Sequence, residues 1–122
     1  MINIYVVLAI LFIHWIADFI CQNDWQAKNK SKRLDALLLH TLTYSMIWFI
    51  PCVAYICENK HNFSYFFFIP ITFVCHTITD YFTSRLNSKL WSEGKIHWFF
   101  VSVGFDQILH YVQLLLTYQL LK

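Results

Sequence analysis

The chain has 122 residues, of which 58% are hydrophobic, 20% aromatic and 13% charged, and its net charge is +2. A soluble domain carries about 25% charged residues, and a soluble fold of this size and composition would have too few polar side chains to cover its surface. The composition therefore excludes an ordinary soluble domain and predicts a membrane protein. No internal repeat or domain boundary is visible, so we expect a single domain over residues 1–122.

Four apolar stretches are each long enough to cross a bilayer, which takes about 20 helical residues. An open chain can satisfy its backbone hydrogen bonds in lipid only as a helix, so these stretches predict an all-α, integral membrane four-helix bundle. The first stretch lacks the basic start of a signal peptide and is expected to be retained. The predicted spans are residues 2–21, 34–57, 63–83 and 96–121.

Lys and Arg residues are divided unevenly among the connections. Short loops rich in Lys and Arg face the cytoplasm. The first and third connections hold seven of the nine, against Lys60 and Lys122 elsewhere, so both termini are predicted on the non-cytoplasmic side of a multi-pass protein. The net charge is thus a topology signal, and we expect no nucleic-acid partner. The seven are Lys28, Lys30, Lys32, Arg33, Arg85, Lys89 and Lys95.

Four histidines and three aspartates lie inside the predicted spans, away from the span ends. A central Asp costs about 2.5–3.5 kcal/mol to insert, so the group needs a compensating interaction. Three spans carry a His and an Asp four residues apart, which places both side chains on one helix face. Allowing for span direction, every Asp lies nearer the cytoplasm than its His, by about 6 Å. We expect the spans to converge on one site that opens toward the cytoplasm. The residues are His14, Asp18, His40, His76, Asp80, Asp106 and His110.

These residue types favour metal binding. Imidazole nitrogen and carboxylate oxygen are ligands of Zn²⁺, Mn²⁺ and Fe²⁺, and seven ligands exceed one tetrahedral zinc but suit two ions with a bridging carboxylate. Two such ions can activate a water for hydrolysis. The hypothesis takes all seven as ligands of one or two divalent ions, zinc before manganese or iron. Asp18, Asp80 and Asp106 are the catalytic candidates, and one of them is an alternative general base. Gln22 and Gln107 are expected to orient substrate or ligands.

Each feature also has a structural interpretation. A single intramembrane histidine such as His40 is more often a helix-packing hydrogen bond, and one His/Asp pair can be a buried ion pair between helices. Tyr44 and Trp48 are interpreted as lipid-facing or packing residues, and His61 and His97 as solvated. The basic segment 28–33 is primarily a topology determinant, and it can also attract anionic lipid headgroups.

The motifs resemble those of a family of bacterial and phage polytopic membrane proteins, a domain of unknown function. The resemblance covers nearly the whole chain and implies no established reaction. The family usually has a Lys shortly after Asp80, where this chain has Thr83, Ser84 and Arg85; if that Lys contacts an anionic group, Arg85 takes its place. The matching blocks are His14-Trp-Ile-Ala-Asp18-Phe-Ile-Cys-Gln22 with Trp25 and Lys28 or Lys30, then Leu39-His40, His76-Thr-Ile-Thr-Asp80 and Phe105-Asp106-Gln107-Ile-Leu-His110.

The His/Asp pattern is also similar, more loosely, to predicted membrane-bound metal-dependent hydrolases. The leading hypothesis is such a hydrolase in a bacterial inner membrane, acting on a lipid, lipid-linked or amphipathic phosphoester, ester or amide, with a homo-oligomer left open. One alternative is a proton or ion relay or transporter, although residues 47–56 and 65–71 in the outer halves of spans two and three are almost wholly apolar. Another is a non-enzymatic phage or host envelope-interaction protein.

Overall fold

A computed structural model describes residues 3–59 and 62–122, and all regular structure within them is helical. The all-α prediction is confirmed for these residues. The predicted start of the first span at Ile2, together with Lys60 and His61, lies outside the described residues. In chain order the elements are α1 (Ile4–Trp15), the π-helical η1 (Ile16–Ile20), α2 (Asp24–Asn29), α3 (Leu34–Ile47), α4 (Phe49–Glu58), the 3₁₀-helical η2 (Phe63–Phe67), α5 (Phe68–Ser92) and α6 (Ile96–Leu121).

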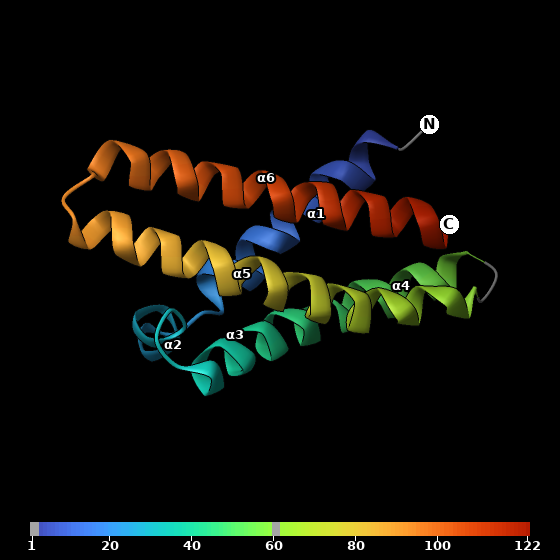
Figure 1. Cartoon of the computed structure of the whole chain (residues 1–122). Helices are drawn as coiled ribbons and strands as arrows, with labels where there is room; N and C mark the ends of the chain where they lie inside the picture. The colour runs from blue at the N-terminus through green and yellow to red at the C-terminus, as the bar shows by residue number, and fades with distance from the viewer. Residues whose placement is uncertain (1–2, 60–61) are drawn as a thin grey trace.

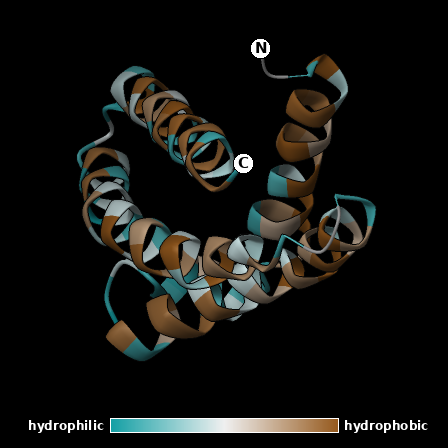
Figure 2. Cartoon of the chain, turned by 90° about the vertical axis from the view of Figure 1, so that its right-hand side faces the viewer, coloured by the Kyte–Doolittle hydropathy of each residue, from teal (hydrophilic) through white to brown (hydrophobic). Residues whose placement is uncertain are grey.

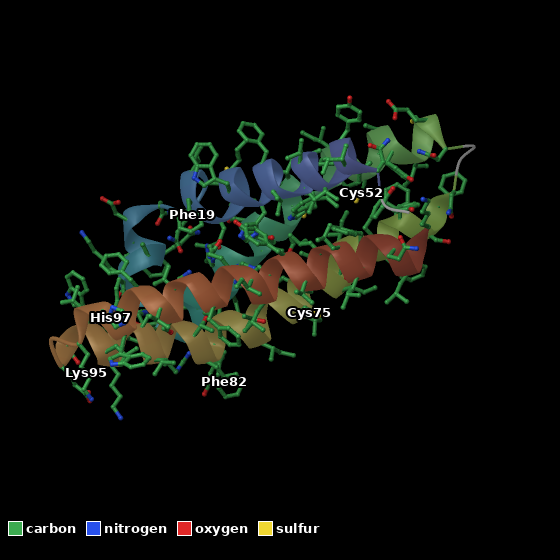
Figure 3. All side chains as sticks on the ribbon, turned by 90° about the horizontal axis from the view of Figure 1, so that it is seen from above. Phe19, Cys52, Cys75, Phe82, Lys95 and His97 are labelled. Atoms are coloured by element: carbon green, nitrogen blue, oxygen red, sulfur yellow. The ribbon has the colours of Figure 1, made fainter. Side chains whose placement is uncertain are left out.

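Three helical stretches are long and apolar enough to cross a membrane, namely residues 34–58, 63–92 and 96–121. The α1–η1 stretch is apolar but shorter. Large hydrophobic side chains such as Phe82 and Leu120 are exposed, by 66% and 84%; Figure 2 shows hydrophobic residues along the outer faces of the helices, and Figure 3 shows Phe82 pointing outward. This pattern suits a protein surrounded by acyl chains, because lipid solvates apolar surfaces.

The helices place the connections at two opposite ends of the molecule. The start of α1, the end of α4 and the end of α6 lie at one end of Figure 1, and α2 lies toward the opposite end, where the α5–α6 connection turns. Helix α5 continues past the predicted end of its span at Thr83 and stops at Ser92. Gly94 ends it with a φ of 69°, and the Lys95 N–H donates to the Leu90 carbonyl at 2.9 Å, as in a Schellman motif.

Both prolines inside predicted spans have a local structural effect. Pro51 has no N–H to donate to the carbonyl of Ile47, so the helix is interrupted at Trp48, between α3 and α4. Pro70 lies in the first turn of α5, where a missing N–H costs nothing.

The core between the helices contains many polar side chains. Its fully buried side chains include Tyr44, Leu37 and Leu114 together with four imidazoles.

Candidate metal centre

The structure brings all seven predicted ligand residues into one buried cluster, in which no residue is more than 8% exposed. Helices α1, α3, α5 and α6 and the η1 turn each contribute. In η1 the Cys21 N–H donates to the Ile16 carbonyl at 2.9 Å, a bond spanning five residues. This π-type turn widens the helix around Asp18 and changes the direction in which its carboxylate points, relative to a regular helix. Such turns occur often at functional sites.

Four side chains from three elements form the centre of the cluster. The Nε2 atoms of His40 and His76 lie 3.2 Å apart, and Asp18 Oδ1 lies 3.1 Å from the first and 3.5 Å from the second. Asp80 Oδ2 completes the group, 3.3 and 3.7 Å from the same two nitrogens. Ligands about 2.0–2.1 Å from a tetrahedral zinc are separated from one another by about 3.3–3.4 Å. Five of the six separations among these atoms, 3.1–3.7 Å, bracket this value, and the two carboxylate oxygens lie within 4.8 Å of each other, so the four residues could hold a tetrahedral ion.

A second group shares one carboxylate with the first. Asp18, Asp106 and His110 each offer a ligand atom within 4.8 Å of the others. His110 Nε2 lies 3.3 Å from Asp106 Oδ1 and 3.1 Å from Asp80 Oδ1. Asp80 therefore presents one oxygen to each group, and Asp18 belongs to both. Two ions joined by a bridging carboxylate would use this arrangement.

His14 is held by hydrogen bonds at both ring nitrogens. Its Nε2 lies 2.8 Å from Gln107 Oε1, and its Nδ1 lies 2.7 Å from the Tyr44 hydroxyl. Because an amide oxygen only accepts, Nε2 donates and Nδ1 accepts from Tyr44. The Gln107 Nε2 in turn donates to Asp106 and Asp18, at 3.2 and 3.4 Å. His14 thus lies beside the two groups and orients their carboxylates through Gln107.

Tyr44 has a larger role than its sequence interpretation gave it. It is fully buried, so it does not face lipid, and its ring stacks on His76 with centroids 3.9 Å apart. His76 stacks on His110 at 4.2 Å, which fixes the planes of both imidazoles. The signal in the sequence was the spacing, since Tyr44 follows His40 by the same four residues that separate the His/Asp pairs. Trp48 is buried and packs, as one of its two interpretations held.

Lys30 is a site residue that the sequence analysis interpreted primarily as a topology determinant. Its Nζ lies 2.8 Å from Asp80 Oδ2 and 3.5 Å from His40 Nε2. A capping box between Asn23 and Gln26 starts α2 and turns the chain back beneath the cluster. Burial alone would lower the pKa of Lys30, but Asp80 and Asp18 outweigh it and raise that pKa above its ordinary value. The cluster therefore contains one fixed ammonium.

Gln22 and Arg85 lie in different surroundings. Gln22 lines a cavity of about 590 Å³ that Asp18 and Asp106 also line. The Arg85 guanidinium packs 3.7 Å from the centre of the Tyr81 ring and donates to the Tyr81 carbonyl at 2.8 Å, so the structure does not bring it to the cluster. His97 is exposed, as expected.

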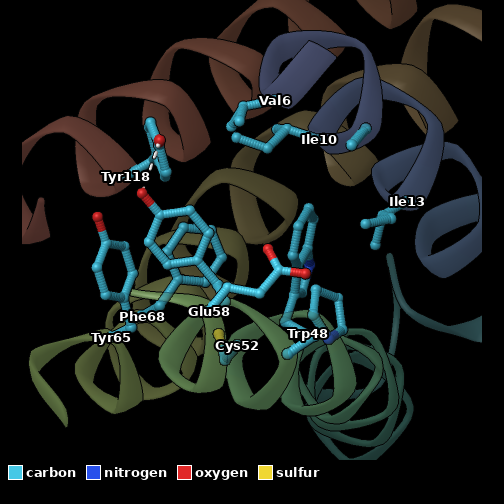
Figure 4. A pocket seen from close by; sticks show the side chains of 13 residues that line it. Val6, Ile10, Ile13, Trp48, Cys52, Glu58, Tyr65, Phe68 and Tyr118 are labelled. Atoms are coloured by element: carbon cyan, nitrogen blue, oxygen red, sulfur yellow. Dashed lines mark hydrogen bonds between the residues drawn. The ribbon is translucent and has the colours of Figure 1, made fainter. Parts of the chain in front are cut away.

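A second cavity, of about 250 Å³, lies on the other side of the cluster. Figure 4 shows its wall of aliphatic and aromatic side chains, including Ile10, Trp48 and Phe68. Glu58 is the only charged residue among the described residues that line it. The larger cavity, by contrast, is lined by Asp18 and Asp106 of the cluster and by residues of α2.

Comparison with known proteins gives one result. The model of one family, described as protein of unknown function (DUF3307), matches residues 6–122, a range that includes every residue of the cluster. No curated protein and no solved structure matches the chain.

Proposed function

The chain belongs to the DUF3307 family, and we propose that it is a metal-dependent hydrolase embedded in a bacterial inner membrane. The observation that carries the proposal is the spacing of four ligand atoms from Asp18, His40, His76 and Asp80, which has the edge lengths of a tetrahedral metal site. The substrate is a lipid, a lipid-linked molecule or another amphipathic phosphoester, ester or amide, because the site lies within the apolar part of the chain.

We propose four membrane spans with both termini on the non-cytoplasmic side. The fourth span is α1–η1. It contributes His14 and Asp18 to the same buried cluster as α5 and α6. Its length from Ile4 to Ile20 falls at the lower end of the range of about 17–25 residues for a span. The two basic connections lie toward the same end of the molecule, opposite the start of α1 and the end of α6 (Figure 1), as the positive-inside rule requires of cytoplasmic loops.

The net charge of the cluster indicates how many divalent ions neutralise it. Three carboxylates and the Lys30 ammonium leave two net negative charges, which one divalent ion neutralises. A second ion would supply the positive charge that an anionic substrate needs. Zinc suits the mixed nitrogen and oxygen donors, with manganese or iron as alternatives. A bound ion supplies Lewis acidity, which polarises the substrate and makes a water molecule nucleophilic.

The residues of the cluster have different proposed roles. Asp18, His40, His76 and Asp80 hold the first ion, and Asp106 and His110 with Asp18 hold a second. Asp106 lines the larger cavity, so its carboxylate is the one best placed to take a proton from a water there. The Tyr44–His14–Gln107 chain fixes the orientation of the carboxylates, in the manner of hydrogen bonds around metal ligands.

The proposal is tested by hydrolysis assays on detergent-purified protein that is stripped with a chelator and reloaded with Zn²⁺ or Mn²⁺. The substrates are a phosphomonoester lipid, a phosphodiester lipid and an acyl ester lipid. We expect chelator-sensitive hydrolysis of at least one, lost in His76→Ala and Asp106→Asn and kept in His97→Ala, which changes an exposed histidine. Folded protein that binds no metal and hydrolyses none of the three would overturn the proposal.

A proton relay is the second candidate, because one observation favours it. The hydrogen bonds from Tyr44 through His14 and Gln107 to Asp106 form a continuous chain in the core. The Tyr44 end of this chain packs against Trp48, which lines the mostly apolar cavity of Figure 4. Proton flux into liposomes that is lost in Asp106→Asn, without hydrolysis, would favour this candidate.

A further inference from the structure

The larger cavity lies between η1, α2 and the parts of α5 and α6 nearest their connection. Its wall contains two chemically different kinds of side chain. Some are polar or positively charged, among them Gln22, Lys28, Lys30, Ser84 and Asn87. Others are large aromatic residues, namely Phe19, Trp91 and Phe99, of which the first two are 47% and 55% exposed. A ligand with both a polar and an apolar part suits such a wall.

Besides one oxygen each of Asp18 and Asp106, three polar atoms of uncharged side chains that line this cavity are buried without a hydrogen-bond partner in the part of the chain that the structure describes. They are Gln22 Oε1, Ser84 Oγ and Asn87 Oδ1, from the segment after η1 and from α5. Buried polar groups nearly always have partners. A hydroxyl can donate, and an amide can turn its NH₂ into the cavity, so the three side chains can meet an acceptor-rich ligand.

The charges around the cavity select the sign of that ligand. Lys28 in α2 and Lys30 just after it line the cavity, and so do Asp18 in η1 and Asp106 in α6. The two carboxylates belong to the candidate metal groups, so their charge is balanced by a bound cation together with Lys30, which is paired with Asp80. Lys28 then remains as the positive charge that a ligand meets, and it attracts an anion.

We propose that this cavity binds the phosphate group of an anionic amphiphile, with its chains passing along the Phe19–Trp91–Phe99 side into lipid. A phosphate oxygen accepts from lysine, hydroxyl and amide donors alike. The inference rests on the proposed function, since it names the class of substrate presented to Asp106 and the metal groups. Trp91 and Phe99 pack edge to face at 5.0 Å and form a firm wall for an acyl chain.

Native mass spectrometry of the metal-loaded protein in detergent tests this proposal. The probes are dioleoyl phosphatidic acid, dioleoylglycerol with the same chains but no phosphate, and inorganic phosphate as competitor. We expect phosphatidic acid adducts, few dioleoylglycerol adducts, and no displacement by inorganic phosphate at equal concentration. Lys28→Gln should weaken phosphatidic acid binding about fivefold, the effect of about 1 kcal/mol for one lysine near a surface.

Two further variants test whether the binding depends on residues that line the cavity. Asn87→Leu, which keeps the branched shape and removes the amide, should also weaken binding. Lys32→Gln should not, because Lys32 is an exposed lysine of the same connection that does not line the cavity. Equal binding of both lipids, or phosphatidic acid binding unchanged in Lys28→Gln, would overturn the inference. Displacement by equimolar inorganic phosphate would contradict the role given to the chains.

The outcome is separable from that of the proposed function. Phosphatidic acid binding that depends on Lys28 would support this inference even if no hydrolysis were found. Chelator-sensitive hydrolysis without selective phosphatidic acid binding would overturn this inference and leave the metal-dependent hydrolase standing.

Discussion

The Nε2 atoms of His40 and His76 lie 3.2 Å apart, although they come from different helices. Both also lie within 3.5 Å of the same oxygen of Asp18. Two imidazole nitrogens can share a hydrogen bond only if one carries a proton and the other a lone pair. A divalent ion accepts the lone pairs of both nitrogens and of the carboxylate at once, which is the physical basis of the proposed site.

The position of Asp18 in both metal groups predicts an asymmetry between two aspartates. Asp18→Ala should lower the metal content to near zero, because it removes a ligand from each group. Asp106→Ala should reduce it only by the second ion, since the other four ligand atoms remain. The check is the ratio of metal to protein in detergent-purified samples. An Asp18→Ala protein with undiminished metal would contradict the shared role.

Tyr44→Phe should weaken metal binding about tenfold while leaving its stoichiometry unchanged. The substitution removes the 2.7 Å hydrogen bond to His14 and keeps the ring stacked on His76, and loss of a group that orients ligands costs about 10–100-fold in affinity. Competition with a chromophoric chelator measures the change. Tyr81→Phe, on the exposed face of α5, is the matched control and should have no effect.

Lys30→Met should tighten metal binding, by about tenfold or more. The Lys30 ammonium lies 2.8 Å from Asp80 Oδ2 and competes with any cation for that oxygen; opposite charges at such distances interact by about 4 kcal/mol at an effective dielectric constant of 20. Without metal the same variant should be less stable by about 3 kcal/mol, because the buried Asp80 carboxylate loses its ammonium partner. Chelator competition and thermal melts measure both effects.

A matched control for Lys30 is Arg85→Met, since the Arg85 guanidinium packs against Tyr81 outside the cluster. It should change neither metal affinity nor hydrolysis. Weaker metal binding in Lys30→Met would mean that Lys30 supports the ion, and the competition described here would be wrong.

The proposed orientation can be checked with the natural cysteines. Cys57 is exposed on α4, close to the end that carries both termini. With Cys21, Cys52 and Cys75 replaced by Ala, a membrane-impermeant maleimide should label Cys57 in spheroplasts without lysis. The same background with Cys57→Ala and Lys32→Cys should be labelled only after lysis. The opposite labelling pattern would show that the termini lie on the cytoplasmic side and contradict the proposed orientation.

The sequence was sufficient to predict the residues that gather in the core. Ionisable side chains are costly in lipid, and a four-residue spacing fixes the face of a helix from which they project, so pairs such as His76 and Asp80 could be placed without coordinates. Their common depth followed from their positions along the spans and from the directions of the spans. Tyr44 follows His40 by the same four residues, but it was interpreted as a lipid-facing or packing residue. Inserting an aromatic side chain into lipid costs little free energy, so its sequence position does not call for a polar partner.

Other features depend on tertiary structure that no local pattern reveals. Lys30 reaches Asp80 because α2 folds back beneath the cluster, whereas its sequence context is that of any cytoplasmic basic loop. The engagement of both nitrogens of His14 follows from where α6 places Gln107 and α3 places Tyr44. Arg85 lies one turn beyond Tyr81, and the contact between them draws it away from the site.

The most direct test of the central claim is X-ray absorption at the metal edge on purified protein, compared with His76→Ala. We predict a bound transition metal with nitrogen and oxygen ligands at about 2.0–2.1 Å, including the scattering signature of imidazole, and loss of that signal in the variant. A folded wild-type protein without bound metal, or with metal whose ligands are unchanged in His76→Ala, would contradict the account.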